Sequence, residues 1–215
     1  MRTVVFTLAL LVATQASAAA PQPIVWNCES ADAFQKLSQV PALRTAHKLG
    51  EASALIASLA PADRANRHAQ FDSALIVLDA NGKNPAVWSS ALTNLAHLAD
   101  AMPNYSQLSP AQRACQETPR LYAIFNTLGV QYSQSGNRAA AIRYFLRGEA
   151  NEAALAPDSR AKLNYNLGVY YTGQLNLDKA SYYYQRAKSP AAIVQFQAIQ
   201  KAQTLAPVQA TAPAH

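Results

Sequence analysis

Residues that could carry acid–base, nucleophilic or metal chemistry are few and widely spaced in this chain. The four histidines are His47, His68, His97 and His215. We expect each to be solvent-facing or a satisfied helical residue, outside any ligand set of i,i+4 spacing. Asp72 and Asp79 are seven residues apart and can share one helix face, where solvation alone accounts for them.

Familiar catalytic motifs are missing from the sequence. It contains no G-x-S-x-G elbow, no P-loop, no dinucleotide fingerprint and no H-E-x-x-H. We therefore predict a protein that is not an enzyme and that uses no cofactor and no metal. An enzyme whose site is assembled from distant residues is the less favoured alternative.

The first residues have the layout of a secretory signal peptide. Arg2 precedes an apolar run from Val4 to Ala13, and a small-residue A-x-A site follows. We predict cleavage after Ala18, because cleavage after Ala20 would place Pro21 directly behind the cut bond. An uncleaved anchor would need about 20 apolar residues. The chain is thus predicted to be exported to the periplasm or outside the cell.

The chain contains two cysteines, Cys28 and Cys115. An exported protein meets an oxidising compartment, where an even cysteine count favours a disulfide. We predict a Cys28–Cys115 bond, with two separately buried thiols as the alternative.

Composition and the positions of prolines that can begin helices predict an all-α fold. Half of the 215 residues are hydrophobic and 14% are charged, which favours closely packed helices. Proline at Pro41, Pro61 and Pro85 is placed to begin helices that would run to about Leu59, Ala80 and Ala99. Apolar residues from Val87 to Leu98 follow helical spacing.

Two segments of the C-terminal half repeat one another. NTLGVQYSQSGN begins at Asn126 and YNLGVYYTGQLN begins at Tyr165. The shift that places Leu128 on Leu167 aligns nine positions, of which eight are identical: Leu128/Leu167, Gly129/Gly168, Val130/Val169, Tyr132/Tyr171, Asn137/Asn176, Ala141/Ala180, Tyr144/Tyr183, Phe145/Tyr184 and Arg147/Arg186. Glycine within a helix costs roughly 1 kcal/mol against alanine, so a packing reason is expected for it. We expect the missing Cβ to admit a neighbouring helix, with Ala141 or Ala180 as the matching contact.

These segments resemble tetratricopeptide repeats (TPR), helix-turn-helix units of about 34 residues. The family pattern of Leu-Gly, an aromatic, an alanine, a second aromatic and a proline is matched in the first unit by Leu128, Gly129, Tyr132, Ala141, Phe145 and Pro157, and in the second by Leu167, Gly168, Tyr171, Ala180, Tyr184 and Pro190. The spacing between Leu128 and Leu167 is longer than in the family, which predicts that the helix from about Asn137 to Ala156 runs one turn long.

The resemblance implies a TPR-like solenoid with supporting helices at both ends, because about three units are usually needed for stability. The expected division of the chain is a signal peptide (1–18), an N-terminal helical region (19–118), two repeats with a capping helix (119–205) and a disordered tail (206–215). Residues 41–80 are similar to a helical hairpin, and 85–117 to a degenerate unit.

The resemblance also implies where a partner would bind. First helices of such units line a concave face, which here would present Asn126, Val130, Ser133, Gln134, Lys162, Tyr165, Asn166, Val169 and Thr172. Asparagine can pair with a peptide backbone, Lys162 with a carboxylate, and Tyr165 offers amphipathic contact area. The carboxylate clamp of the family is not reproduced, because Val130 replaces an asparagine.

Positive charge is concentrated in the repeat half. Residues 19–119 contain 7 Lys/Arg and 8 Asp/Glu, whereas residues 120–215 contain 10 and 4. Second helices carry Arg138, Arg143, Arg147, Lys179, Arg186 and Lys188. This face could meet an acidic partner or an anionic membrane, or could simply be solvated. Nucleic acid is a less favoured partner, because the chain has no basic run or nucleic-acid-binding module.

The sequence thus favours an exported, non-catalytic adaptor that binds a protein or peptide. A self-associating structural subunit of an envelope assembly is the alternative.

Overall fold

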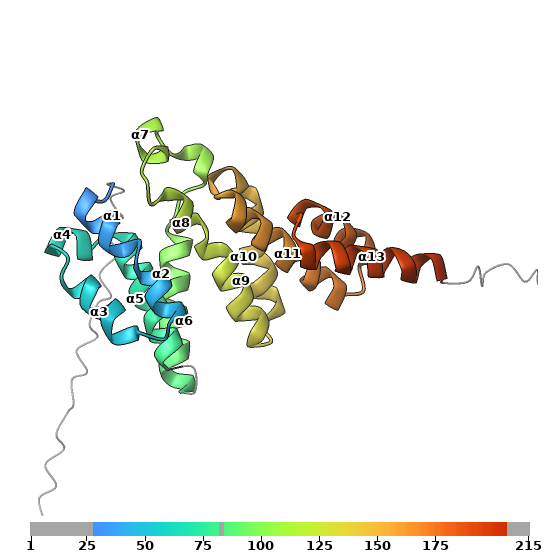
Figure 1. The fold of residues 1–215 in the computed structure, drawn as a ribbon, viewed down its shortest axis with the longest axis horizontal. Helices are drawn as coiled ribbons and strands as arrows, with labels where there is room; N and C mark the ends of the chain where they lie inside the picture. The colour runs from blue at the N-terminus through green and yellow to red at the C-terminus, as the bar shows by residue number, and fades with distance from the viewer. Residues whose placement is uncertain (1–27, 82–83, 206–215) are drawn as a thin grey trace, which may run out of the picture.

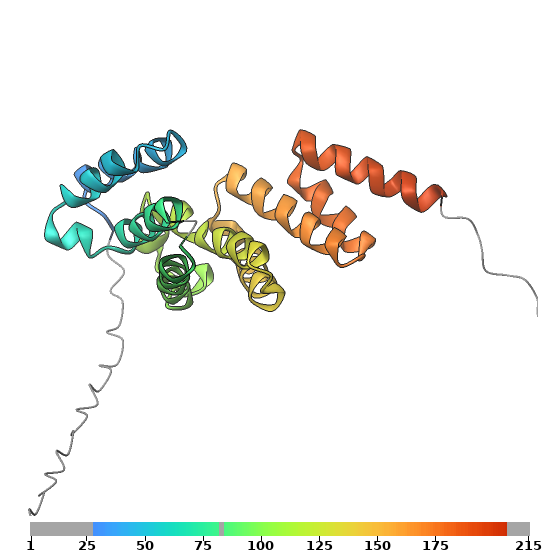
Figure 2. The same ribbon diagram turned by 90° about the horizontal axis from the view of Figure 1, so that it is seen from below.

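The computed structural model describes residues 28–81 and 84–205, and both the predicted signal peptide (1–18) and the predicted disordered tail (206–215) lie outside them. In this part of the chain the elements are helices and no strand is present, which confirms the all-α expectation. The helices form a curved row, with α1 (Ala31–Leu37) near one end and α13 (Pro190–Leu205) at the other (Figures 1 and 2). None of the described helices is long and apolar enough to cross a membrane.

The N-terminal region contains shorter helices than the proline positions predict. The expected helix from Pro41 to Leu59 is divided into α2 (Val40–Thr45) and α3 (Leu49–Ala57), because His47 has a left-handed backbone with φ of 56°. The expected helix from Pro61 is likewise divided, into α4 (Pro61–Arg64) and α5 (Arg67–Ala80). Asn66 separates them and caps α5, because its side chain accepts a hydrogen bond from the N–H of His68. The next helix, α6 (Pro85–Asp100), agrees with the prediction.

A short connection leads from α6 to the repeat segments. It contains η1 (Tyr105–Gln107), α7 (Pro110–Arg113) and α8 (Thr118–Tyr122). Two helical hairpins follow, formed by α9 (Ile124–Gln134) with α10 (Arg138–Ala150) and by α11 (Pro157–Gly173) with α12 (Leu177–Ala187). The predicted extra helical turn is absent, because α10 ends at Ala150 and the separate η2 (Glu152–Ala154) takes up the added residues.

Each repeat hairpin is held by a glycine that meets an aromatic ring. A Cβ at Gly129 would lie 2.8 Å from Cγ of Phe145, and a Cβ at Gly168 would lie 2.6 Å from Cδ1 of Tyr184. The expected packing role of the glycines is therefore present, and the atoms nearest to each Cβ position belong to the aromatic ring later in the same hairpin. The other predicted packing residues also belong to the core clusters, fully or partly buried: Leu128, Tyr132, Ala141, Leu167, Tyr171 and Ala180.

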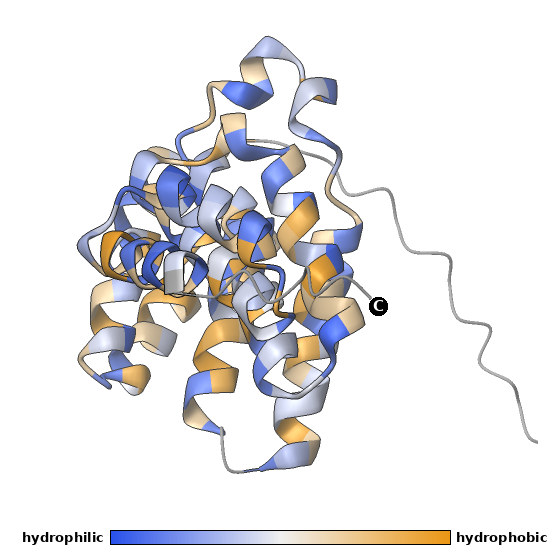
Figure 3. Ribbon diagram, turned by 90° about the vertical axis from the view of Figure 1, so that its right-hand side faces the viewer, coloured by the Kyte–Doolittle hydropathy of each residue, from blue (hydrophilic) through white to orange (hydrophobic). Residues whose placement is uncertain are grey.

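A pair of stacked tyrosines recurs at equivalent positions of the two hairpins. The rings of Tyr132 and Tyr144 lie 5.5 Å apart at an interplanar angle of 6°. Those of Tyr171 and Tyr183 lie 5.5 Å apart at 2°. Because the two pairs are aligned by the same shift as the sequence segments, the sequence repeat corresponds to the same packing used twice. Hydrophobic and hydrophilic residues occur together on the helices (Figure 3), so each helix can bury one side and expose another.

Equivalent arginines tie each hairpin to the element before it. Arg147 Nη1 donates to Asp100 Oδ1 at 3.1 Å. Its counterpart Arg186 donates through Nε to Asn164 Oδ1 at 3.2 Å and through Nη2 to Glu152. The contacts of Arg147 with Asp100 and of Arg186 with Glu152 join each hairpin to the element before it, whereas the contact of Arg186 with Asn164 lies within the second hairpin.

The predicted basic surface is therefore partly neutralised within the chain. Arg147 and Arg186 make the contacts above, and Arg143 lies 3.7 Å from the carboxylate of Asp100. Arg138 is exposed at the start of α10. Fewer cationic groups are left for an external anion than the sequence alone suggests.

The glycine contacts predict a large difference between two similar substitutions. Gly129→Ala or Gly168→Ala should lower the free energy of unfolding by about 2 kcal/mol, because the added methyl group overlaps an aromatic ring. Gly173→Ala is the matched control, since no atom lies within 4 Å of its Cβ position. Urea unfolding should find the control neutral or stabilised by up to about 1 kcal/mol. Equal effects at the three positions would contradict the packing role.

Cys28 and Cys115 lie at disulfide distance and are joined, with Cα atoms 5.3 Å apart and a sequence separation of 87. We expect reduction, or Cys28→Ser, to lower the free energy of unfolding by about 4 kcal/mol, because a long loop is no longer closed in the unfolded chain. Denaturant titration with and without reductant measures this difference. Peptide mapping that finds two free thiols in the protein purified without reductant would show that the bond does not form.

Candidate functional site

Four of the predicted partner-binding residues line one pocket on the repeat segments. This pocket, which we call the repeat pocket, has a volume of about 370 Å³ and lies among α9, α11 and the start of α13. Its lining residues are Asn126, Asp158, Ala161, Lys162, Tyr165, Asn166, Ser189 and Ala191. The register of the repeat therefore brings the first helices of both hairpins to one site.

Two asparagines, one from each hairpin, are hydrogen-bonded at this pocket. Asn166 Nδ2 donates to Asn126 Oδ1 at 2.8 Å. This bond uses one donor of Asn166 and fixes the orientation of both amides. Asn126 Nδ2 then offers donors and Asn166 Oδ1 an acceptor, a combination that matches the C=O and N–H of a peptide group.

The other polar groups of the repeat pocket lie along α11. Asp158 and Lys162 are exposed and one helical turn apart, so the rim carries both signs of charge. Tyr165 is half-buried, and its ring centroid lies 5.7 Å from that of Tyr184 on α12. The pocket thus combines an aromatic wall with amide and charged groups.

The remaining predicted partner-binding residues do not line the repeat pocket. Val130 is half-buried against the core, while Ser133 and Gln134 are exposed at the end of α9. Val169 is 47% exposed. The hydroxyl of Thr172 donates to the carbonyl of Gly168 at 2.9 Å within its own helix.

A second group of polar residues, which sequence reasoning missed, is buried between α1, α5 and α8. We call it the buried polar cluster; it consists of Glu29, His68, Asp72, Glu117 and Arg120. His68 Nδ1 lies 2.7 Å from Glu29 Oε1, and His68 Nε2 lies 3.5 Å from Asp72 Oδ2. Arg120 Nη2 donates to both oxygens of Asp72 at 2.6 and 2.8 Å. The backbone N–H of Glu29 donates to Glu117 Oε1 at 3.0 Å.

This cluster corrects two expectations about isolated polar residues. Asp72 lies four residues after His68 on α5, so this histidine does have an acidic partner at i,i+4 spacing. Asp72 is fully buried rather than solvated, whereas Asp79 lies on the surface and pairs with Arg44. The i,i+4 spacing was the available sequence signal. Glu29 and Glu117 carry no such signal, because tertiary packing alone brings them to α5.

Burial sets the protonation of the cluster. Desolvation raises the pKa of Glu29 from 4.5 to about 7, against the opposing charge of Arg120. Desolvation, with Arg120 adding to it, lowers the pKa of His68 from 6.5 to about 4. The pKa of Asp72 is raised by burial, although Arg120 counteracts the shift. His68 is therefore neutral at pH 7, and a proton taken up near that pH goes to Glu29.

The acidic groups and the imidazole of the buried polar cluster are shielded from solvent, whereas the side chain of Arg120 is 23% exposed. His68 and Asp72 are 0% exposed and Glu117 is 1% exposed. Arg120 also donates to the backbone carbonyl of Leu37 at 3.1 Å, which fixes the end of α1. The arrangement joins three helices through charged hydrogen bonds.

The raised pKa of Glu29 predicts that the effect of Glu29→Gln on stability depends on pH. A carboxyl whose folded pKa is raised stabilises the fold at low pH and loses that contribution as pH rises toward its folded pKa. The wild type should therefore lose the Glu29 contribution between about pH 4.5 and pH 7, whereas Glu29→Gln does not. The stability of the variant relative to wild type should increase across that interval in urea titrations. Asp32→Asn, at an exposed position of α1, is the control. A constant difference between Glu29→Gln and wild type would contradict the raised pKa.

Comparison of the chain with protein-family models, with curated proteins and with solved structures found no match.

Proposed function

We propose that this chain is an exported, non-catalytic TPR-like protein that binds a peptide segment of another protein in the repeat pocket. The proposal rests on one observation. Asn126, from the first repeat hairpin, lines the same pocket as Lys162, Tyr165 and Asn166, from the second. A binding site that spans two repeat units requires both to be folded and packed in register.

The chemistry of the pocket suits an extended peptide. The hydrogen-bonded asparagines offer a donor and an acceptor to one peptide group, and Tyr165 offers a flat apolar surface to a side chain. Lys162 and Asp158 at the rim can each meet a side chain of opposite charge. Because exposed charge pairs contribute little affinity, the amide pair and the ring are expected to provide most of it.

Binding is favoured over catalysis by where the titratable groups lie. Glu29 and His68, whose pKa values are strongly shifted, have side chains that are only 1% and 0% exposed. The accessible repeat pocket is lined by amides, hydroxyl groups, one lysine and one aspartate. This set serves recognition, since none of its members is paired as a nucleophile with its base.

Export is supported by two independent features. The first residues have the order expected of a cleaved signal peptide, with cleavage proposed after Ala18. The Cys28–Cys115 disulfide suits an oxidising compartment, the periplasm or the extracellular space.

The proposal is tested by crosslinking and pull-down from an envelope extract. Asn126→Ala combined with Asn166→Ala should reduce recovery of crosslinked partners about tenfold, because both amide contacts to the peptide backbone are removed. Lys162→Ala should reduce recovery less and should weaken its salt dependence.

Gln185→Ala, at an exposed position of α12, is the matched control and should recover the same partners as wild type. Circular dichroism and urea unfolding establish that the double variant is folded. Recovery of identical partner sets by the folded double variant and wild type would overturn the assignment of the repeat pocket.

A further inference from the structure

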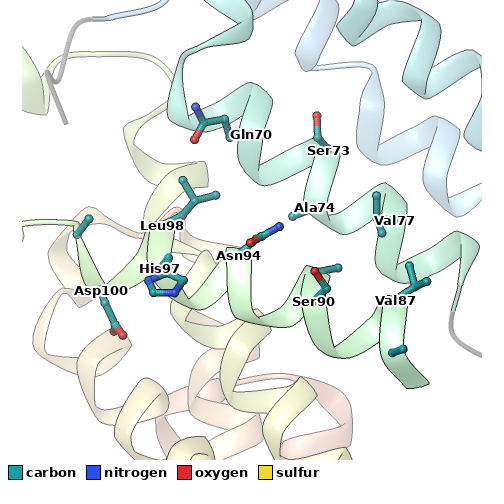
Figure 4. A pocket seen from close by; sticks show the side chains of 13 residues that line it. Gln70, Ser73, Ala74, Val77, Val87, Ser90, Asn94, His97, Leu98 and Asp100 are labelled. Atoms are coloured by element: carbon teal, nitrogen blue, oxygen red, sulfur yellow. The ribbon is translucent and has the colours of Figure 1, made fainter. Parts of the chain in front are cut away.

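A pocket larger than the repeat pocket lies between α5 and α6. It has a volume of about 1050 Å³, and we call it the N-terminal groove (Figure 4). Its side chains are small, apolar or uncharged along most of its length. The lining residues are Gln70, Ser73, Ala74, Val77, Ala86, Val87, Ser90, Ala91, Asn94, His97, Leu98, Asp100 and Ala101.

The N-terminal groove is a face of the α5–α6 hairpin that other described helices leave uncovered. Within the row, α6 packs against α9, and α10 packs against α11. α1, α2 and α3 also pack against α5, and α3 reaches the edge of the groove at Ser73 and Val77. Val77 on α5 consequently remains 37% exposed, and Ser90 and Asn94 on α6 are exposed. The α5–α6 hairpin therefore has one face that no described helix hairpin covers.

The opposite end of the row also has an uncovered helix. The last described helix, α13, packs against α12 through Ala192 and Ile199. Its outer side exposes two large apolar residues, Ile193 at 49% and Val194 at 61%. A helix at the end of a repeat array normally has a polar outer face, so this apolar exposure indicates a surface that becomes covered.

The two uncovered surfaces match in length and in polarity. α6 and α13 each contain 16 residues. α13 carries one charged residue, Lys201, and its other polar side chains are Gln and Thr. The amides of Gln70 and Asn94 in the N-terminal groove can pair with such side chains. A contact of Val194 on α13 with Val77 in the groove would bury two apolar side chains and no charged group.

Charge further favours contact between opposite ends of two molecules. Residues 28–81 contain 5 Lys/Arg and 6 Asp/Glu, whereas residues 157–205 contain 6 and 2. One end is therefore slightly negative and the other is positive. This asymmetry attracts unlike ends and repels two C-terminal ends.

We propose that the N-terminal groove binds α13 of a second copy of this chain, so that copies associate head to tail. The contact is heterologous, with different surfaces on the two molecules, and each added copy leaves one groove and one α13 open. The row of helices then continues from one molecule into the next, and each molecule keeps its own repeat pocket.

The inference is tested by sedimentation velocity of the exported protein across a wide range of concentration. Wild type should form dimers and longer chains as its concentration rises. Ser90→Arg in the groove and Val194→Arg on α13 should each reduce association at least tenfold, because a charged side chain occupies the contact. Ser89→Arg adds the same charge on α6 outside the lining and should associate like wild type.

Mixing the two variants distinguishes head-to-tail association from other arrangements. Ser90→Arg retains an intact α13 and Val194→Arg retains an intact groove, so an equal mixture should form dimers and no longer chains. Wild type that remains monomeric at every concentration would overturn the proposal. Association lost in Ser90→Arg but unchanged in Val194→Arg would overturn it as well, because it would show that α13 is not the occupant. Asn126→Ala with Asn166→Ala tests only the repeat pocket and should not change sedimentation.

Discussion

The close contact between a glycine and an aromatic ring is the constraint on which the C-terminal half depends. Gly129 and Gly168 allow the rings of Phe145 and Tyr184 to lie against the backbone of the facing helix. The distance between the two helices of a hairpin is thereby fixed by one missing methyl group. Because α10 packs against α11, that spacing contributes to the relative position of α9 and α11, which the Asn126–Asn166 hydrogen bond also joins at the repeat pocket.

Several electrostatic contacts in the described part of the chain join one helix to another. Arg147 joins α10 to the end of α6, and Arg186 joins α12 to α11 and to η2. Similarly, Arg120 joins α8 to α5, because its Nη2 donates hydrogen bonds to both carboxylate oxygens of buried Asp72. The sequence suggests that these charged groups form an external basic surface. In the structure several of them instead hold neighbouring helices together.

The sequence predicts the repeat half well because its information is local. The spacing of Leu-Gly and the later aromatic identifies each hairpin, and the register of the repeat brings Asn126 and Asn166 to one place. The N-terminal region is less predictable. The left-handed backbone conformation at His47 could not be predicted, because this position is neither a glycine nor a proline. Glu29 reaches His68 only because distant segments pack together, so no periodic pattern contains that contact.

The disulfide between Cys28 and Cys115 encloses α1 to α7 in one covalent ring. The described chain before α8 therefore cannot separate from the row by fraying at its N-terminal end. The C-terminal helices have no such closure, and α13 rests on a single hairpin. Partial opening should consequently begin at α13 and proceed backwards, so the repeat pocket opens before the N-terminal groove. Occupation of α13 by a second copy would then protect the repeat pocket from opening, and the two sites would share one source of stability.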